Sequence, residues 1–392
     1  MWIKRTLESE ILKAARQRPS VLVTGSRQSG KTSLLQKIFP HYSYVALDPP
    51  HVAEEAEESG GQFLQKYPTP LILDEVQYAP HLFRHLKTAI DHRRKESGLY
   101  LLTGSQKFAL MQGVTESLAG RISLFELHTL SLAELERWSG KSAEGNQLLE
   151  WLFLGGYPEL YERGLNPERF YSDYLVTYLE RDVRQALKVR ELRDFDRFMR
   201  LAAGRTGQIL SLNSFASDLG ISPITVKNWL SVLEASNIIY LLEPYYRNLG
   251  KRIVKSPKLY FLDTGLACYL LGIRTPADLK QNNLLGPLFE TLVLGQMIRW
   301  YANQGKRPDL YFWRDHFGHE VDFVIPVGEN LKLYECKWGE TSPERVKGFE
   351  EIERLQGHHI LSKAVISSTR GHRKTKMNFF IDDAVELKML SL

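Results

Sequence analysis

Eight residues near the N-terminal end, Gly25-Ser-Arg-Gln-Ser-Gly-Lys-Thr32, have types and spacing suited to holding phosphate. Glycines let the backbone pass close to an anion, and successive N–H groups at the start of a helix face it. Lys31 adds a positive charge, and the Thr32 hydroxyl can ligate Mg²⁺. The run matches G-x-x-x-x-G-K-[ST] between an apolar run and a helix-like stretch. It predicts a P-loop that binds ATP with Mg²⁺ through Gly25, Ser26, Arg27, Gln28, Ser29, Gly30, Lys31, Thr32 and Ser33.

Two acids end the apolar run Leu71-Ile-Leu-Asp74-Glu75. An acid in this place holds the metal, usually through water, so Asp74 joins Thr32 as a metal residue. Glu75 is then placed to orient or deprotonate the attacking water, which predicts ATP hydrolysis. The alternative is an acidic surface turn after a core strand.

Two further polar residues follow the next apolar runs. In Thr103-Gly-Ser105-Gln106, Ser105 is predicted to touch the γ-phosphate or the water, against the alternative of an ordinary turn. Arg121, in Leu118-Ala-Gly-Arg121, is a candidate arginine finger for a neighbouring subunit, against a structural salt bridge. We therefore list Glu75, Ser105 and Arg121 as candidate catalytic residues.

Four charged residues gather in the C-terminal part. If Gly328-Glu329 forms a tight hairpin turn, Asp322 lies opposite Glu335 and Glu320 opposite Lys337, all on one face. Val321, Phe323, Ile325, Tyr334 and Cys336 then point the other way. Carboxylates on one face can hold Mg²⁺, and a nearby lysine can activate water. Glu290 from an upstream helix is a further candidate ligand. The order Glu, Asp, Glu-x-Lys resembles that of the PD-(D/E)xK nucleases, which makes Glu290, Asp322, Glu335 and Lys337 a candidate nuclease site; the alternative is a solvated hairpin face.

Residues 206 to 262 carry the order helix, turn, helix, two strands. Leu212 to Leu219 and Ser222 to Ala235 are predicted helices, and Ile238–Leu242 and Lys258–Leu262 are predicted strands. This order is typical of a winged helix-turn-helix. The candidate DNA contacts are Thr225, Lys227, Asn228, Lys251 and Arg252, in a basic stretch that also holds Arg247, Lys255 and Lys258. Packing against a protein partner is the alternative.

The elements that must position these residues fall into four predicted domains. Short apolar runs at Val21–Thr24, Tyr44–Leu47, Leu71–Leu73 and Leu99–Leu102 alternate with helix-like stretches, which indicates a doubly wound α/β sheet. The predicted fold is a P-loop NTPase (AAA+-like) parallel-sheet domain at 1–128, a helical lid at 129–205, the winged helix-turn-helix at 206–283 and an α+β restriction-endonuclease-like domain at 284–392.

Composition limits the class of protein. The chain has 392 residues, 43% apolar and 25% charged, the balance of a globular protein. Its net charge of +5 permits DNA binding without requiring it. Two cysteines, Cys268 and Cys336, are too few for a disulfide framework. Charges interrupt the N-terminus and no run is long enough to span a membrane, so we expect a cytoplasmic protein.

The ordered set of motifs resembles the prokaryotic AAA+-type ATPases that carry a C-terminal domain of unknown function with a nuclease-like fold of the PD-(D/E)xK type. The likeness runs across nearly the whole chain. It is carried by Gly25–Thr32, Leu73–Glu75, Thr103–Ser105, Leu118–Arg121, Gly155–Glu159, Tyr178–Asp182, Phe261–Leu266, Glu290, Tyr311–Arg314, Glu320–Phe323 and Glu335–Lys337. Gln106 departs from the pattern, because a second small polar residue is expected there.

The resemblance implies ATP binding, a winged helix and a restriction-endonuclease-like end. The leading hypothesis is an ATPase whose nucleotide state controls DNA engagement, in a homo-oligomer. One alternative is a nucleotide-dependent signalling or defence switch whose C-terminal domains bind protein partners without cleaving DNA. Another is an active metal-dependent nuclease.

Overall fold

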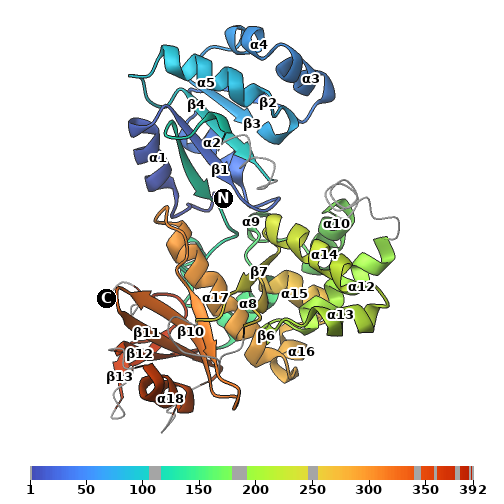
Figure 1. Cartoon of the computed structure of the whole chain (residues 1–392), viewed down its shortest axis with the longest axis vertical. Helices are drawn as coiled ribbons and strands as arrows, with labels where there is room; N and C mark the ends of the chain where they lie inside the picture. The colour runs from blue at the N-terminus through green and yellow to red at the C-terminus, as the bar shows by residue number, and fades with distance from the viewer. Residues whose placement is uncertain are drawn as a thin grey trace. The chain divides into compact units, whose positions relative to one another are not determined.

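The computed structural model describes residues 2–105, 116–178, 192–245, 255–339, 346–356, 360–375, 380–387 and 390 (Figure 1). The chain divides into two compact units. The first, unit 1, comprises Met1–Leu130, Ala235–Asn237 and Arg299–Arg307, and the second, unit 2, comprises Ser131–Glu234, Ile238–Ile298 and Pro308–Leu392. Among the described residues, no helix combines the length and apolar character needed to cross a membrane.

Unit 1 is built on a parallel sheet of strand order β2-β3-β4-β1-β5. The four predicted strands are confirmed, and a fifth, β5, was not predicted. The bounds are β1 Ser20–Thr24, β2 Ser43–Ala46, β3 Leu71–Asp74, β4 Tyr100–Gly104 and β5 Ile122–Glu126. The predicted α/β class is therefore correct for this unit.

Helices bury both faces of this sheet (Figure 1). Leu22 and Leu73 lie in one apolar cluster with Phe83 and Ile90 of α5, whereas Val21 and Ile72 lie in another with residues of α1 and α2. Neighbouring residues of one strand point to opposite faces, so a continuous apolar run is needed to fill both clusters. The helices are α1 Glu8–Gln17, α2 Lys31–Ile38, α3 Pro50–Glu58, α4 Gly60–Lys66 and α5 Leu82–His92, with a 3₁₀ turn η1 Val76–Tyr78.

Unit 2 begins with helices, as predicted. A capping box begins the first helix, because the Ser131 hydroxyl accepts from the Glu134 N–H and the Glu134 carboxylate accepts from the Ser131 N–H. The helices of this segment are α7 Leu132–Ser139, α8 Gly145–Leu154, α9 Pro158–Glu162, α10 Pro167–Tyr178 and α12 Leu192–Gly204. Most of the Tyr178–Asp182 motif lies outside the described residues.

Two helices and an antiparallel sheet follow, with the predicted elements confirmed. Helix α13 Leu212–Leu219 ends at Gly220, whose φ of 71° is left-handed. Helix α14 Pro223–Ala235 begins after Ser222, whose hydroxyl accepts from the Thr225 N–H at 3.0 Å. Strands β6 Gln208–Ile209, β8 Lys258–Phe261 and β7 Ile239–Leu242 form the sheet in the order β6-β8-β7.

The C-terminal part holds a sheet of order β13-β14-β12-β11-β10-β9. Its core packs Trp313, Val321 and Leu333 against Phe349 and Ile352 of α18. The strands are β9 Tyr311–Arg314, β10 Glu320–Val327, β11 Asn330–Lys337, β12 Ile360–Ser367, β13 Arg373–Lys374 and β14 Phe380–Asp383. The helices are α15 Thr264–Leu270, α16 Pro276–Gln281, α17 Leu285–Ala302 and α18 Lys347–Gln356.

The predicted β10–β11 hairpin is confirmed in its register, since Phe323 pairs with Tyr334 and Val327 with Asn330. Gly328, with φ 63°, is the first central residue of the turn. The predicted alternation along β10 is wrong, because Val321 and Val324 pack in the same cluster. The pairing of β10 with β9 shifts register between these two residues, and a bulge there reverses which side chains face the core.

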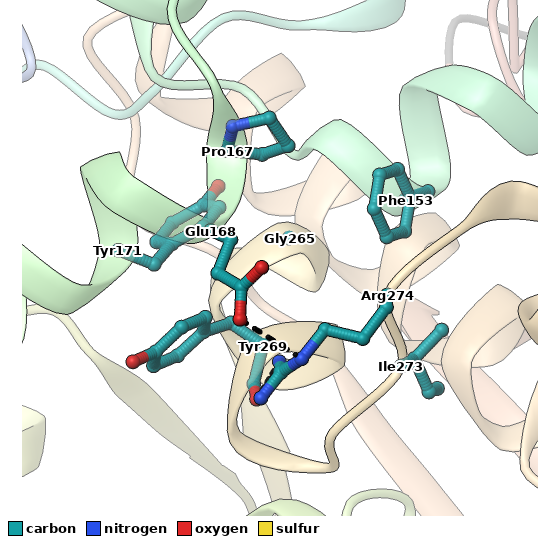
Figure 2. Close-up of a pocket in the computed structure, with 8 residues that line it drawn as sticks. All are labelled: Phe153, Pro167, Glu168, Tyr171, Gly265, Tyr269, Ile273 and Arg274. Carbon is teal, nitrogen blue, oxygen red and sulfur yellow. Dashed lines mark hydrogen bonds and ion pairs between the residues drawn. The ribbon is translucent and has the colours of Figure 1, made fainter.

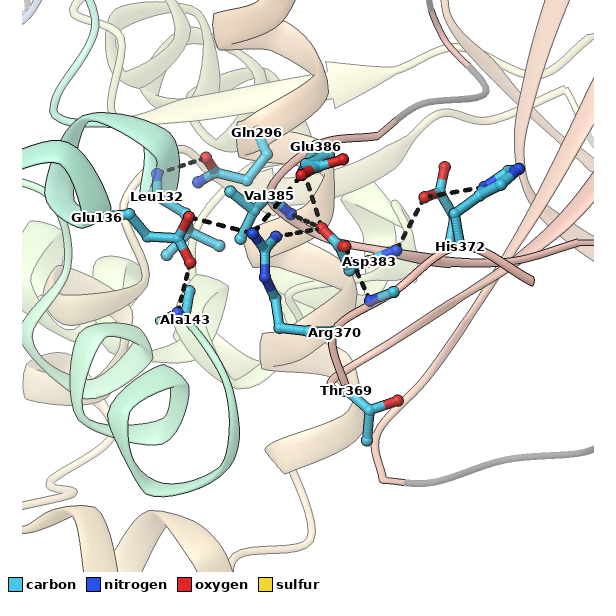
Figure 3. Close-up of polar contacts among 12 residues, drawn as sticks. Leu132, Glu136, Ala143, Gln296, Thr369, Arg370, His372, Asp383, Val385 and Glu386 are labelled. Atoms are coloured by element: carbon cyan, nitrogen blue, oxygen red, sulfur yellow. Dashed lines mark hydrogen bonds and ion pairs between the residues drawn. The ribbon is translucent and has the colours of Figure 1, made fainter. Parts of the chain in front are cut away.

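An arginine joins the first helix of unit 2 to its last sheet (Figure 3). The Arg370 guanidinium contacts Asp383 at 2.8 Å, Glu136 of α7 at 3.4 Å and Glu386 at 3.8 Å. The α7 start is further held by a hydrogen bond from the Leu132 N–H to Gln296 of α17. The helical segment and the C-terminal sheet are therefore bonded within one unit.

Candidate functional site

The predicted phosphate loop lies between β1 and α2, where its backbone takes a shape that needs glycine. Gly25 has φ 146°, and a side chain there would lie 2.1 Å from the Leu127 carbonyl oxygen. Gln28 and Gly30 have φ 58° and 93°, and Gly30 is the residue from which α2 begins. These conformations turn the chain so that the first N–H groups of α2 are presented at the loop, as an anion-binding site requires.

Lys31 is buried at the base of this loop, with 5% of its surface exposed. Its ammonium donates to the carbonyl oxygens of Gly25 at 3.1 Å and Ser26 at 2.8 Å. The Ser29 hydroxyl also donates to the Ser26 carbonyl. The side chain is thus held against the loop by hydrogen bonds to two of its carbonyl oxygens.

Arg5, which the sequence analysis did not single out, also contacts the loop. The Arg5 guanidinium donates to the carbonyl of Ser29 at 2.9 Å and to that of His128 at 2.6 Å, and Arg5 is 5% exposed. The chain before α1 therefore fixes the phosphate loop against the segment that follows β5. Nothing in a single arginine at this distance from the motif signals the contact.

Asp74, at the end of β3, accepts hydrogen bonds from three hydroxyl groups. Thr32 donates to Oδ1 at 2.7 Å, Thr103 of β4 also donates to Oδ1, and Tyr44 of β2 donates to Oδ2 at 2.9 Å. Burial, and next the charge of Asp74, raises the pKa of the Tyr44 hydroxyl, which therefore stays a donor. The predicted pair Thr32 and Asp74 is brought together, and Tyr44 and Thr103 were missed.

Glu75 lies beside Ser105, whose predicted contact with the γ-phosphate or the water stays a prediction. Ser105 donates to Glu75 Oε2 at 3.3 Å, and the Glu75 N–H donates to Thr103 at 3.1 Å. Strand β4, which ends at Gly104 directly before Ser105, lies between the P-loop strand β1 and the Asp74 strand β3. Glu75 has a left-handed φ of 56°, a conformation rare for residues with side chains and found most often at functional sites.

Gln77 is the third residue at the Glu75 carboxylate. Its amide donates to Glu75 Oε2 and lies 3.4 Å from the Ser105 hydroxyl. The Gln77 amide oxygen is buried and has no hydrogen-bond partner among the described residues. Sequence reasoning missed Gln77, although its position two residues after the acid pair is a usable signal.

The other predicted residues of unit 1 are placed less directly. Arg121 forms an ion pair with Asp91 of α5, at 2.7 and 3.0 Å, and this hydrogen bond lowers the pKa of the Asp91 carboxyl. This contact is the salt bridge weighed against an arginine finger, and the finger stays a prediction. Arg27 is half-buried and Ser33 exposed, and Gln106 lies outside the described residues.

Predicted C-terminal residues form a carboxylate cluster in unit 2. Two features differ from the predicted set: Glu320 joins Glu290 and Asp322, and Lys258 supplies a cation. Oxygens of Glu290, Glu320 and Asp322 lie within 4.8 Å of one another. Lys258, which the sequence placed in a basic wing, instead directs its ammonium to Glu320 at 2.5 Å and Glu290 at 3.0 Å, with its side chain 1% exposed. Lys258 is therefore buried in ion pairs and is not an exposed residue of the basic stretch.

The predicted pair Glu335 and Lys337 lies at the edge of this cluster. Lys337 contacts Glu335 Oε1 at 2.7 Å, and Glu335 Oε2 is buried without a partner among the described residues. The Cys336 N–H donates to Asp322 Oδ2 at 2.8 Å. Burial raises the pKa of Asp322, with further increases from the charges of Glu290 and Glu335.

The predicted DNA contacts are partly described. Lys227 and Asn228 are exposed on α14, and Thr225 is half-buried with its hydroxyl 2.9 Å from that of Ser222. The buried side of α14 consists of Val226, Trp229, Leu230 and Leu233. Lys251, Arg252 and Arg247 lie outside the described residues.

Two motifs without a derived mechanism meet at one buried acid, Asp263. Its carboxylate caps α15 and accepts from the Gly156 N–H and the Tyr171 hydroxyl, both at 2.9 Å. A side chain on Gly155 would lie 2.2 Å from the same carboxylate. Figure 2 shows the adjoining pocket, lined by residues that include Tyr171, Arg274 and Glu168, of which Arg274 and Glu168 form an ion pair at 3.1 Å. The motifs Gly155–Glu159 and Phe261–Leu266 therefore contact each other through Asp263.

The geometry of unit 1 defines a class of protein. A parallel sheet carries a phosphate loop after β1, an acid pair after β3 and a polar residue after the strand between them. This arrangement is that of a P-loop NTPase.

The comparisons with known proteins agree with this class. Residues 17–136 match the family described as AAA domain, so this part is an AAA-type P-loop ATPase domain that binds nucleotide. Residues 145–277 and 285–387 match two domains of unknown function, DUF8612 and DUF4143.

The uncharacterized protein Rv2008c of Mycobacterium tuberculosis is 31% identical over 339 residues, which are 85% of this chain and 74% of that protein. The chain belongs to the same family as Rv2008c. The uncharacterized protein MJ1637 of Methanocaldococcus jannaschii is 25% identical, over 86% of this chain and 79% of that one. The structure of the Walker-type ATPase PABY2304 of Pyrococcus abyssi is similar over 69% of this chain and 96% of that chain, with 16% identity and a TM-score of 0.47.

Proposed function

We propose that this chain hydrolyses ATP at the loop of Lys31, with Glu75 acting on the attacking water. The observation that carries the proposal is the position of Glu75. Its carboxylate follows β3 directly after Asp74, and Ser105 and Gln77 hold it by hydrogen bonds. A carboxylate fixed in this way, one residue from a metal-binding acid, suits a general base.

The groups around Asp74 fit a magnesium ion. Mg²⁺ prefers oxygen ligands, and the Thr32 hydroxyl and the Asp74 carboxylate lie 2.7 Å apart. We propose that these two residues hold the ion, and that the Tyr44 hydroxyl leaves Asp74 when they do. When bound, the ion supplies positive charge to the β- and γ-phosphates.

Lys31 is the group that changes partners when nucleotide binds. Its ammonium leaves the carbonyls of Gly25 and Ser26 for phosphate oxygens, where an ion pair replaces neutral hydrogen bonds. Ser105 and Gln77 keep the Glu75 carboxylate in place by donating hydrogen bonds to Oε2. The chain thus separates the residue that binds phosphate from the residue that acts on water.

The test of this part is phosphate release from Mg-ATP by the full chain. Wild-type protein should turn over ATP, and Lys31→Ala should lose both ATP affinity and turnover. Lys37→Ala, which removes a lysine from the last turn of the same helix, is the control and should keep both. ATP affinity unchanged in Lys31→Ala would contradict the role of the loop.

We further propose that the nucleotide state controls DNA binding by residues 206–283, acting as a winged helix, beside a C-terminal domain of nuclease-like fold. The support is the order α13, α14, β7, β8 and the exposure of Lys227 and Asn228 on α14. Such side chains can contact bases or phosphates when a helix enters the major groove. A homo-oligomer in the cytoplasm remains our prediction for the working form.

DNA-stimulated ATP turnover tests the coupling. Duplex, single-stranded and branched DNA should be compared at low salt, because phosphate contacts weaken steeply as salt rises. Lys227→Ala should reduce the stimulation and leave the basal rate unchanged. Lys280→Ala, an exposed lysine of α16, is the matched control. If no DNA stimulates turnover, the coupling is refuted, and the separate proposal of ATP hydrolysis is unaffected.

A switch without DNA cleavage is a second candidate, and one observation favours it. Lys258 lies among the carboxylates that a metal-dependent nuclease would use. In this alternative the C-terminal parts bind a protein partner, and the chain purifies with ADP and turns over slowly.

A further inference from the structure

The carboxylate cluster of unit 2 contains its own cation. Lys258, from the middle strand of the three-stranded sheet, places its ammonium 3.0 Å from Glu290 of α17 and 2.5 Å from Glu320 of β10. Asp322 Oδ1 lies 4.0 Å from the same nitrogen. The lysine side chain is 1% exposed, so water does not screen these contacts.

Glu290, Glu320 and Asp322 each have at least one oxygen with a donor from the protein. Glu290 Oε1 accepts from both Lys258 and the Tyr260 hydroxyl, which uses both of its lone pairs. Arg314 contacts the second oxygen of Glu320 at 2.8 Å. The backbone N–H of Cys336 donates a hydrogen bond to Asp322 Oδ2. Each carboxylate thus has a protein partner of its own.

A divalent metal does not fit this arrangement. Mg²⁺ binds carboxylate oxygens at about 2.1 Å and requires a near-octahedral shell. An ion bound to the oxygens of Glu290 and Glu320 that Lys258 contacts would touch the ammonium, and two cations would share one small buried space. Glu290 and Glu320 therefore do not share a metal through these two oxygens while Lys258 contacts both.

The second lysine of this region supports the same conclusion. Lys337, which the motif assigns to catalysis, instead pairs with Glu335 and is 47% exposed.

We propose that Lys258 is the permanent cation of this cluster, taking the place that a metal holds in a nuclease. The cluster then joins β8 to α17 and β10 and ties the sheet of the helix-turn-helix segment to the C-terminal domain. This inference goes beyond the proposed ATP hydrolysis and does not depend on it. It assigns a structural role to residues whose spacing predicts DNA cleavage.

A manganese titration of the full, nucleotide-free chain tests the proposal directly. Free Mn²⁺ is followed by electron paramagnetic resonance in the wild-type protein and in Asp322→Asn, which keeps the shape of the side chain. Because Lys258 excludes the ion, the two curves should coincide, whatever the P-loop binds. A wild-type chain that binds one Mn²⁺ more than Asp322→Asn would overturn the proposal.

Substitution of the lysine tests its role as a cation. Lys258→Met keeps the length of the side chain and removes the charge, and Lys255→Met is the control at an exposed lysine of the same segment. Lys258→Met should lower the melting temperature by several degrees more than Lys255→Met. The double variant Lys258→Met/Glu290→Gln should recover part of the loss, since one unpaired carboxylate is removed with the cation.

The double variant also covers the case in which Lys258→Met does not fold. Recovery of folding in Lys258→Met/Glu290→Gln is then the expected result in its strongest form. If neither variant folds, the effect is due to packing of the lysine stem, and the proposal is overturned. A Lys258→Met chain as stable as Lys255→Met would also overturn it.

Discussion

Both units bury a lysine, but the two lysines have different partners. In unit 1 the ammonium of Lys31 donates to two backbone carbonyls, and Asp74 accepts from hydroxyl groups. In unit 2 the ammonium of Lys258 lies directly on Glu290 and Glu320. Neutral dipoles can release a cation to an incoming phosphate, whereas buried carboxylates hold it.

The difference shows that the same residue types make either a ligand site or a structural contact. A ligand site keeps its cation and its acids on separate neutral partners until the ligand joins them. A structural cluster pairs them in advance, and a group left without its partner is then costly. Spacing in a sequence motif does not distinguish the two cases; the partners of the lysine do.

The largest effect is expected from the same substitution at the two lysines. Lys258→Met leaves buried carboxylates without their cation and should cost about 3–5 kcal/mol of stability. Lys31→Met removes hydrogen bonds to carbonyls and should cost about 1–2 kcal/mol. Calorimetric unfolding of both nucleotide-free variants measures the difference. Equal losses would mean that the two lysines are held in the same way.

For ATP affinity the order of the two variants should be reversed, with the larger loss in Lys31→Met. Lys31→Met removes a charge-assisted contact to phosphate, worth about 1.5–3 kcal/mol, and should raise the Kd roughly 10- to 100-fold. Lys258→Met should bind ATP as the wild-type chain does. Titration with a fluorescent ATP analogue decides this, and weaker binding in Lys258→Met would show that the clusters are coupled.

A smaller effect is expected at Gln77, which acts through Glu75 as a positioning residue. Gln77→Ala removes one donor from the Glu75 carboxylate and should lower kcat roughly tenfold, the equivalent of about 1.5 kcal/mol. The KM for ATP should stay the same, because Gln77 does not contact the phosphate loop in the described residues. Gln77→Asn should restore part of the rate. A change in KM with kcat intact would assign Gln77 to binding.

The smallest effect concerns alkaline pH. The folded-state pKa of Lys258 lies above its ordinary value, so the unfolded chain loses this proton first as pH rises past about 10.4. The folded state then binds more protons, and stability falls as pH rises. This contribution is complete at lower pH and absent in Lys258→Met, which should therefore show a flatter decline above about pH 10 than Lys255→Met. Parallel curves would contradict the pairing.

Features local in sequence were predictable. The phosphate loop is contiguous, so its residue types determine both its shape and its contacts. The two-residue turn at Gly328-Glu329 determines the register of β10 and β11, which is why their pairing was predicted correctly. The capping boxes and the strands buried on both faces follow from the same local rules.

Features that depend on distant partners were not predictable. Lys258 lies 32 positions from Glu290 in the chain. Its place beside a basic segment does not distinguish an exposed lysine from a buried one. The bulge in β10 appears only when the neighbouring strand β9 is known. Arg5 acts on Ser29 and His128 through the folded backbone, so its residue type alone gives no signal.

The central claim is that unit 1 hydrolyses ATP with Glu75 as the base. The most direct measurement is phosphate release and ATP binding by Glu75→Gln beside the wild-type chain. Glu75→Gln keeps the size of the side chain and loses its basicity, so ATP affinity should be unchanged while turnover falls by about 10²-fold or more. Wild-type turnover in Glu75→Gln would contradict the claim and place the base on another residue.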